Sequence, residues 1–255
     1  TRALADPTGP ADPALIGRTD TETARTGLLL PLSATWWTAP SGSRGLTMRL
    51  WDLDKGQPEM VTTGRATGTD AAFHYSQDAT LLWGTSVRNI LSGPLHLTGA
   101  ERRPDGTLAP SNRTSVTRRS TEPDYDDIDL EAVADHLQQT GSGPEGARFE
   151  APVPRLRLIM VAQDGLGPIS IDEVHQHYLL PVMSTDGRRH LLCMEVGGGE
   201  MRMVSDVLSR DLQVHAITVE GDHPSGVFVR EHGRICLLAT TFPPSRSASN
   251  RGYRR

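Results

Sequence analysis

The sequence predicts a β-rich α+β fold, built from two small units of antiparallel hairpins with a few short helices. Short apolar segments alternate with polar residues at the period of a strand. Turn residues such as Gly, Pro and Asp separate these segments at short spacing. Few segments have the apolar period of a helix. The 255 residues are enough to bury a sizeable core without a disulfide or a structural metal.

The apolar residues are distributed unevenly along the chain. Residues 155–242 hold 28 of the 55 Leu, Ile, Val and Phe residues, whereas all four Trp residues lie in the poorer N-terminal part. Each Trp can bury a large apolar area, so we expect them to anchor the N-terminal core. The predicted division is a flexible arm at 1–26, a Trp-anchored β-rich domain at 27–140 ending in a helix, a linker at 141–147, a C-terminal β-rich domain at 148–244 and a basic disordered tail at 245–255.

In the N-terminal domain, a strand with Pro31 at an edge or a bulge is followed by a strand in which Leu46, Met48 and Leu50 alternate with polar residues. The predicted strands are 27–37, 46–53, 59–66, 95–102 and 107–119; the last two are expected to form a hairpin around Pro104-Asp105-Gly106. Helices are predicted at 85–92, which Gly93-Pro94 ends, and at 128–139, which Asp126 or Asp127 can cap.

The C-terminal domain is predicted to consist of strands joined by tight turns. The expected strands are 155–162, 179–183, 188–196, 212–220, 226–231 and 234–242. The run Gly197-Gly198-Gly199 is interpreted as a loop, because neither a phosphate-loop Lys nor a clear helix follows it.

Ser170 and Glu173 have the spacing of a capping box, which predicts a helix that begins there and ends at Pro181. An apolar stripe at helical spacing supports this helix and consists of Ile171, Val174, Tyr178 and Leu179. His175 and His177 would then point in directions about 200° apart and could not share a metal ion. In the alternative, a strand, both imidazoles would lie on one side and could share one.

No metal site is favoured, and no catalytic or cofactor-binding residue is identified. If the chain is a metalloenzyme, the candidate ligands are His175, His177, His190, His223 and His232, with His215 as a further choice. An acidic cluster offers carboxylate spacings but fits a solvated helix start better; it consists of Glu122, Asp124, Asp126, Asp127, Asp129 and Glu131. Cys193 and Cys236 are expected to be small buried side chains, with a disulfide as an unsupported alternative.

Charge and hydropathy exclude several classes of partner. The net charge is −5, and outside the tail no basic stretch suggests a nucleic-acid surface, so only a weak contact through the tail is expected. No apolar run approaches the ~20 residues of a membrane-spanning helix. The 25 Arg against one Lys are typical of a GC-rich bacterial genome.

These observations favour a soluble, cytoplasmic accessory protein without a cofactor. We expect it to bind another protein through sheet edges or exposed hairpins, because motifs for catalysis are lacking. The alternative is a metal-dependent small-barrel enzyme that uses the C-terminal histidines.

Overall fold

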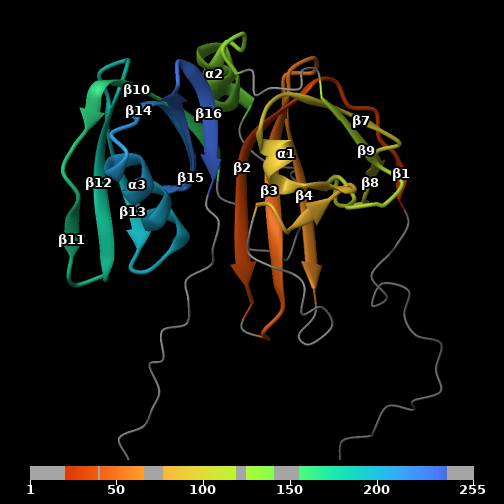
Figure 1. Cartoon of the computed structure of the whole chain (residues 1–255), viewed down its shortest axis with the longest axis horizontal. Coiled ribbons are helices and arrows are strands. Elements are labelled where there is room, and N and C mark those ends of the chain that lie inside the picture. Colours follow the sequence, from red (N-terminus) through yellow and green to blue (C-terminus); the bar gives the residue numbers. More distant parts are fainter. Residues whose placement is uncertain (1–20, 40, 66–76, 119–124, 141–154, 240–255) are drawn as a thin grey trace, which may run out of the picture.

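The computed structural model describes residues 21–39, 41–65, 77–118, 125–140 and 155–239. The predicted linker, the tail and nearly all of the N-terminal arm lie outside these residues. Within them, antiparallel sheets dominate and three short helices accompany them, which confirms the predicted β-rich α+β class (Figure 1).

A five-stranded sheet forms the N-terminal half, in the order β4-β3-β2-β7-β9. Its strands are β2 (Leu29–Thr38), β3 (Arg44–Asp52), β4 (Gln57–Arg65), β7 (Leu95–Thr98) and β9 (Ser115–Arg118). The register of β2 against β3 shifts between Pro31 and Ser33, which confirms the predicted bulge. Two short strand pairs accompany the sheet: β1 (Glu22–Thr23) with β8 (Glu101–Arg102), and β5 (Leu81–Leu82) with β6 (Thr85–Ser86).

The hairpin predicted around Pro104-Asp105-Gly106 is only partly correct. The turn exists, since the Gly106 amide donates to the Arg103 carbonyl over 3.0 Å. The long pairing, however, joins β7 to β9, while β8 leaves that sheet to pair with β1. The reason is that residues 99–114 form a connection between β7 and β9 that is longer than a single turn.

Two predicted helices are confirmed, α1 (Val87–Leu91) and α2 (Leu130–Thr140). The Ser86 hydroxyl caps α1 by accepting from the Asn89 amide over 3.2 Å. The predicted cap of α2 is wrong. The Asp129 carboxylate accepts a hydrogen bond from the Ala132 amide and so caps the helix. The Asp126 carboxylate instead accepts hydrogen bonds from the Arg230 guanidinium and the Ile235 amide, which belong to the C-terminal half of the chain.

A seven-stranded sheet forms the C-terminal half, in the order β11-β12-β10-β14-β15-β16, with β13 also paired to β12. Its strands are β10 (Leu156–Leu166), β11 (Ser170–Asp172), β12 (His177–Ser184), β13 (Arg189–Glu195), β14 (Gln213–Glu220), β15 (His223–Glu231) and β16 (Arg234–Ala239). β10 pairs with β14 through residues 156–160 and with β12 further along. It therefore joins the two parts of the sheet.

The helix predicted to start at Ser170 is wrong, because this segment is the β11–β12 hairpin. Ser170 caps no helix and pairs with Leu179, and Asp172 pairs with His177. One Asp172 oxygen accepts the amides of Val174 and His175, both over 3.0 Å, and so builds the turn. Pairing of β12 with β13 on its other side outweighs the local capping pattern.

A third helix, α3 (Gly199–Ser209), follows β13, where the sequence predicted only a glycine loop. Gly198 is its extended N-cap residue, and Gly199 is its first helical residue. The buried side chains of Met203, Val204 and Val207 hold the helix against one face of the seven-stranded sheet.

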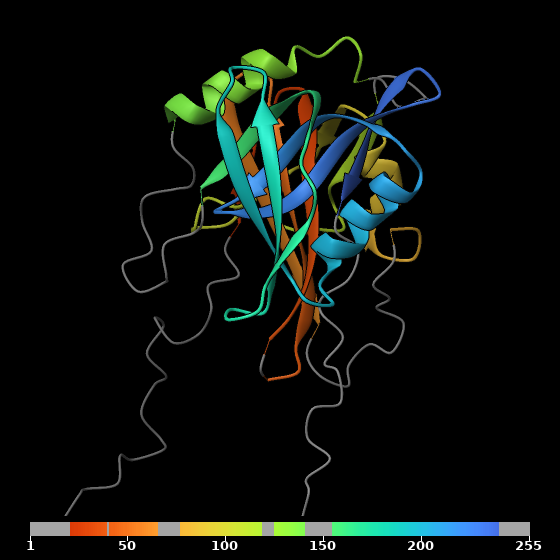
Figure 2. The same ribbon diagram turned by 90° about the vertical axis from the view of Figure 1, so that its left-hand side faces the viewer.

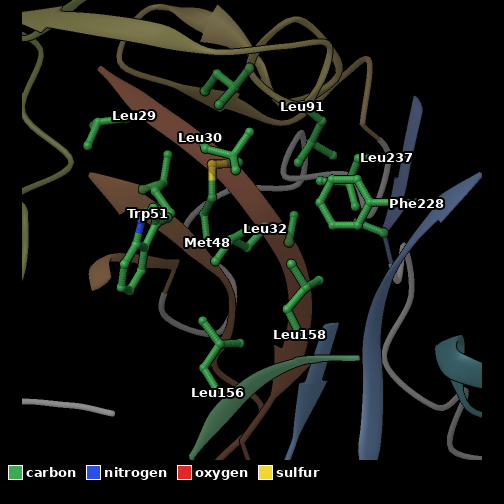
Figure 3. Packing of buried hydrophobic residues seen from close by; sticks show 14 of the residues in the cluster. Leu29, Leu30, Leu32, Met48, Trp51, Leu91, Leu156, Leu158, Phe228 and Leu237 are labelled. Carbon is green, nitrogen blue, oxygen red and sulfur yellow. The ribbon is translucent and has the colours of Figure 1, made fainter. Parts of the chain in front are cut away.

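The opposite face of that sheet shares a core with the five-stranded sheet (Figure 3). Leu30 and Leu32 of β2 lie in the same buried cluster as Leu158 and Phe228 of the seven-stranded sheet. Polar contacts also cross this interface: the Thr218 hydroxyl donates to the Leu32 carbonyl over 2.8 Å. The two sheets are thus separate in strand pairing but continuous in packing, and the division into two domains stays a prediction.

An ion pair reinforces the interface between the sheets. The Arg49 guanidinium of β3 donates to both oxygens of Glu220 at the end of β14, over 2.6 and 2.8 Å. Both side chains are less than one-fifth exposed. Such two-pronged contacts fix geometry as well as adding energy, so this ion pair holds β3 and the end of β14 in a defined relative position.

Candidate functional site

Most of the exposed large apolar side chains belong to one stretch of the chain. Among the described residues, six large apolar side chains are exposed, and four of them fall between positions 171 and 196. These four are Ile171, Val174, Leu191 and Val196. They belong to β11, the following turn, β13 and the residue after it, on the side of the molecule that lies away from the five-stranded sheet (Figures 1 and 2).

Three of these side chains flank one row of cross-strand partners. Asp172, His177 and Glu195 are direct partners across β11, β12 and β13. Ile171 precedes Asp172, and Val196 follows Glu195. Val174 lies in the turn between β11 and β12 and is 85% exposed. We call Ile171, Val174 and Val196 the hairpin tip.

Carboxylates surround the hairpin tip. Glu173 and Glu195 are exposed, and Asp172 is half-buried. Asp172 Oδ2 lies 2.8 Å from His175 Nδ1. The amide and the ring of His175 both hydrogen-bond to Asp172 and hold the pKa of that carboxyl below its usual range. Exposed apolar side chains and carboxylates are therefore neighbours in sequence at this end of the sheet.

His177 and His223 meet at the base of the hairpin tip. His177 begins β12 and His223 begins β15, and their ring centres lie 6.4 Å apart at an interplanar angle of 90°. The sequence analysis named both histidines as candidate metal ligands, but it did not predict that their side chains lie close together.

Glu200, in the first turn of α3, lies beside the same group. A side chain at Gly198 would place its Cβ 2.5 Å from Glu200 Oε2 and 3.2 Å from Glu195 Cβ, so the two glutamates occupy neighbouring space. Burial raises the pKa of Glu200, and the Glu195 charge adds to this, while its own backbone amide and His223 oppose it.

The other predicted candidates lie elsewhere. His190 Nε2 is 3.2 Å from the Ser184 hydroxyl, and burial, with Arg157 nearby, lowers the pKa of this imidazole. Burial likewise lowers the pKa of His215 on β14. His232 occupies the β15–β16 turn with a φ of 51°. In the part of the chain that the structure describes, no three His, Cys, Asp or Glu side chains are placed to hold a metal ion together.

The two cysteines are free thiols rather than a disulfide, and both are half-buried. They are therefore less buried than the expectation of small buried side chains. Burial raises the pKa of each thiol, which leaves them unactivated as nucleophiles. Of the acidic cluster, Glu122 and Asp124 lie outside the described residues, and Asp126 and Asp129 accept backbone hydrogen bonds.

No protein-family model matches the chain, and no curated protein matches it either. Among the described residues, no helix is both long and apolar enough to cross a membrane.

Proposed function

We propose that this chain is a non-catalytic protein-binding module that docks a partner on the hairpin tip. The observation that carries the proposal is the concentration of exposed apolar side chains on the β11–β12–β13 region. Monomeric proteins rarely expose several large apolar side chains close together, and where they do, the exposed surface is commonly a binding site for another molecule.

The partner's chemistry follows from the border of the hairpin tip. Glu173 and Glu195 are exposed carboxylates that directly precede Val174 and Val196 in the sequence. Complementary charge speeds association and selects the partner, while the apolar centre provides most of the affinity. The proposed partner is therefore a protein surface with Arg or Lys residues around an apolar centre.

A metal-dependent enzyme is the less supported alternative. The meeting of His177 and His223 favours it. Against it, the described residues show no three-ligand group, and the two thiols lie in environments that raise their pKa.

Site-specific photo-crosslinking in cells that make the protein tests the proposal. A photoreactive residue at Val174 should crosslink to one basic protein, whereas the same residue at Leu208, which is exposed on α3, should not. The double variant Ile171→Ser with Val174→Ser should lose co-purification of that protein.

The matched control is Leu81→Ser with Leu208→Ser, which removes two other exposed apolar side chains, 60% and 47% exposed, from elsewhere on the molecule. Loss of the partner in both double variants, or no crosslink at Val174, would refute docking at the hairpin tip.

A further inference from the structure

We infer that residues 240–244, which follow β16 in the chain, cover a half-exposed part of the five-stranded sheet around Trp37. These residues are Thr240, Thr241, Phe242, Pro243 and Pro244, and they lie outside the described residues. The inference goes beyond the proposed function, because it concerns another surface of the molecule and does not depend on docking at the hairpin tip.

The surface that this segment would cover is one face of β2, β3 and β4. The face carries two rows of direct cross-strand partners, which are Thr35, Thr47 and Thr62 in one row and Trp37, Gly45 and Gly64 in the next. The row before them contacts the seven-stranded sheet, since Ser33 and Arg49 both reach Glu220. The face therefore continues past the interface between the sheets. We call Thr35, Trp37, Thr47 and Thr62 the Trp37 face; all four are half-buried.

The Trp37 ring lies flat on the sheet. A Cβ added at Gly45 would overlap the ring, and one at Gly64 would lie 3.3 Å from Trp37 Cη2, so the two glycines leave the space that the ring fills. The ring nitrogen donates to the Thr47 hydroxyl over 3.2 Å. The ring is thus fixed in place with its only donor satisfied, and its outer side is an apolar surface that gains from further burial.

The segment that precedes α1 packs on the opposite face of the sheet. Successive side chains of a strand point to opposite faces, so Trp36 and Trp37 lie on different sides. Trp36 is buried, and its ring nitrogen donates to the Thr80 hydroxyl over 3.3 Å. The residues around Thr80 are therefore not what covers the Trp37 face.

The end of β16 is anchored beside the middle of β2. Ala239, the last residue of β16, is 4% exposed in the shared core and is the cross-strand partner of Gly226. Gly226 lies against β2, because a Cβ there would be 2.7 Å from the Leu32 carbonyl oxygen. The chain therefore leaves β16 close to the level of Leu32.

The direction of β16 points the following residues toward Trp37. Thr218 contacts Leu32, and Glu220 contacts Ser33, so β14 runs in the same sense as β2 along their interface. β15 is antiparallel to β14, and β16 is antiparallel to β15, so β16 also runs in the sense of β2 (Figure 1). Trp37 lies further along β2 in that sense.

The length of the segment matches the distance that it has to span. Trp37 is five positions after Leu32 on β2, and Pro244 is five positions after Ala239. At about 3.3 Å per residue, both intervals span roughly 17 Å when extended. An extended course therefore brings Phe242 and the two prolines along the row of Thr35 to Trp37.

The chemistry of the segment suits this surface. Consecutive prolines favour an extended polyproline conformation, and such segments commonly dock on aromatic side chains. Proline has no backbone N–H, so burial of Pro243 and Pro244 leaves no amide donor without a partner. The segment carries no charge, and the Trp37 face consists of uncharged side chains.

Intramolecular photo-crosslinking of the full chain tests the inference. A benzophenone amino acid replaces Phe242, and the purified protein is irradiated at low concentration and digested for mass spectrometry. We expect a crosslink within one chain to a peptide that contains Trp37 or Thr62. The same amino acid in place of Tyr253, beyond the proposed segment, should give no crosslink to these peptides.

Two results would overturn the inference. One is a crosslink from position 242 to any other part of the chain, or none. The other is a crosslink between two chains, which would mean that a second copy covers the Trp37 face.

Hydroxyl-radical oxidation, resolved to single residues by mass spectrometry, provides a second readout on the full chain. Changing Phe242→Ser together with Pro243→Gly and Pro244→Gly should raise the oxidation of Trp37 several-fold. The matched control Tyr253→Ser should leave it unchanged. Trp51 and Trp83, which are 2% and 4% exposed in the core, should stay protected in both variants and so report an intact fold. Equal oxidation of Trp37 in the wild type and the triple variant would contradict the inference.

Discussion

Replacing Phe228 with Ala tests whether the two sheets unfold as one unit. Phe228 lies on β15 of the seven-stranded sheet and is fully buried in the cluster that it shares with β2. Its ring packs edge-on against Tyr125, with ring centres 5.5 Å apart. Truncation leaves a cavity against both sheets, so it should remove stability from both.

The expected cost is about 3–5 kcal/mol, the usual range for a buried Phe→Ala change. In a chain of this size each kcal/mol shifts the melting temperature by about 2–4 °C, so the midpoint should fall by about 10 °C. The loss includes the edge-on contact with Tyr125, which is worth about 1 kcal/mol beyond the buried area.

The assay is equilibrium unfolding in urea, followed by Trp fluorescence and by circular dichroism. All four Trp residues lie before residue 84, so their fluorescence reports on the N-terminal half of the chain. A shared core predicts that Phe228→Ala shifts the fluorescence transition as far as the dichroism transition.

Leu191→Ala serves as the control, because that side chain is about half exposed and should leave both transitions unchanged. If Phe228→Ala moved the dichroism transition and left the Trp transition in place, the shared-core reasoning would be refuted. If the two halves were independent domains, as the sequence predicts, only the dichroism transition would shift.

Four further predictions concern single residues. Trp51→Ala should cost about 3–5 kcal/mol in urea unfolding, because the ring is only 2% exposed; a loss under about 1 kcal/mol would contradict its core role. Ser86→Ala should cost about 1 kcal/mol by the same measurement, through the lost cap of α1, and Ser86→Gly should recover most of it. Alkylation of Cys193 at mildly basic pH should be slower in the native protein than in urea, because burial raises the pKa of its thiol; equal rates would argue against that environment. Burial lowers the pKa of His215 in the native protein. Below a pH of about 6.5 the unfolded chain therefore binds a proton at this imidazole more readily than the native protein does, so the free energy of unfolding should fall as the pH drops through that range. NMR titration should place its pKa below that of a free imidazole, and His215→Gln should flatten the pH dependence of the melting temperature.

Local patterns predicted the elements whose partners are close in sequence. The β2–β3–β4 meander followed from the alternation of Leu46, Met48 and Leu50. The α1 and α2 helices followed from the helical spacing of apolar residues in the sequence, which are Val87, Ile90 and Leu91 in α1 and Leu130, Val133 and Leu137 in α2. In each case the pattern that indicates the element also determines the face that it buries.

The Ser170 segment shows where local reasoning fails. Its capping-box spacing and apolar stripe agreed with each other, yet the pairing of β12 along the length of β13 decides the structure. Periodicity cannot reveal that a partner strand lies nearby. The α3 helix was missed for a different reason: Met203, Val204 and Val207 have helical spacing, but the preceding glycines were interpreted as a loop.

The candidate site depends on the same long-range topology. The sequence identified His177 and His223 separately, and only the long-range strand topology brings their rings to a centre-to-centre distance of 6.4 Å. The involvement of Glu200 depends on a helix that the sequence did not predict. The exposure of the hairpin tip likewise depends on which face of each strand is covered.

The contact between Thr218 and Leu32 has a consequence for synthesis on the ribosome. These two residues are 186 positions apart, and they sit on the interface that closes the shared core. At about 5–20 residues per second, β2 is made on the order of 10–40 s before the strands that cover it. During that interval the apolar side chains of β2 are open to water, to chaperones and to other nascent chains. Chaperones that bind the nascent chain therefore encounter the apolar face of its N-terminal strands before the C-terminal strands cover it.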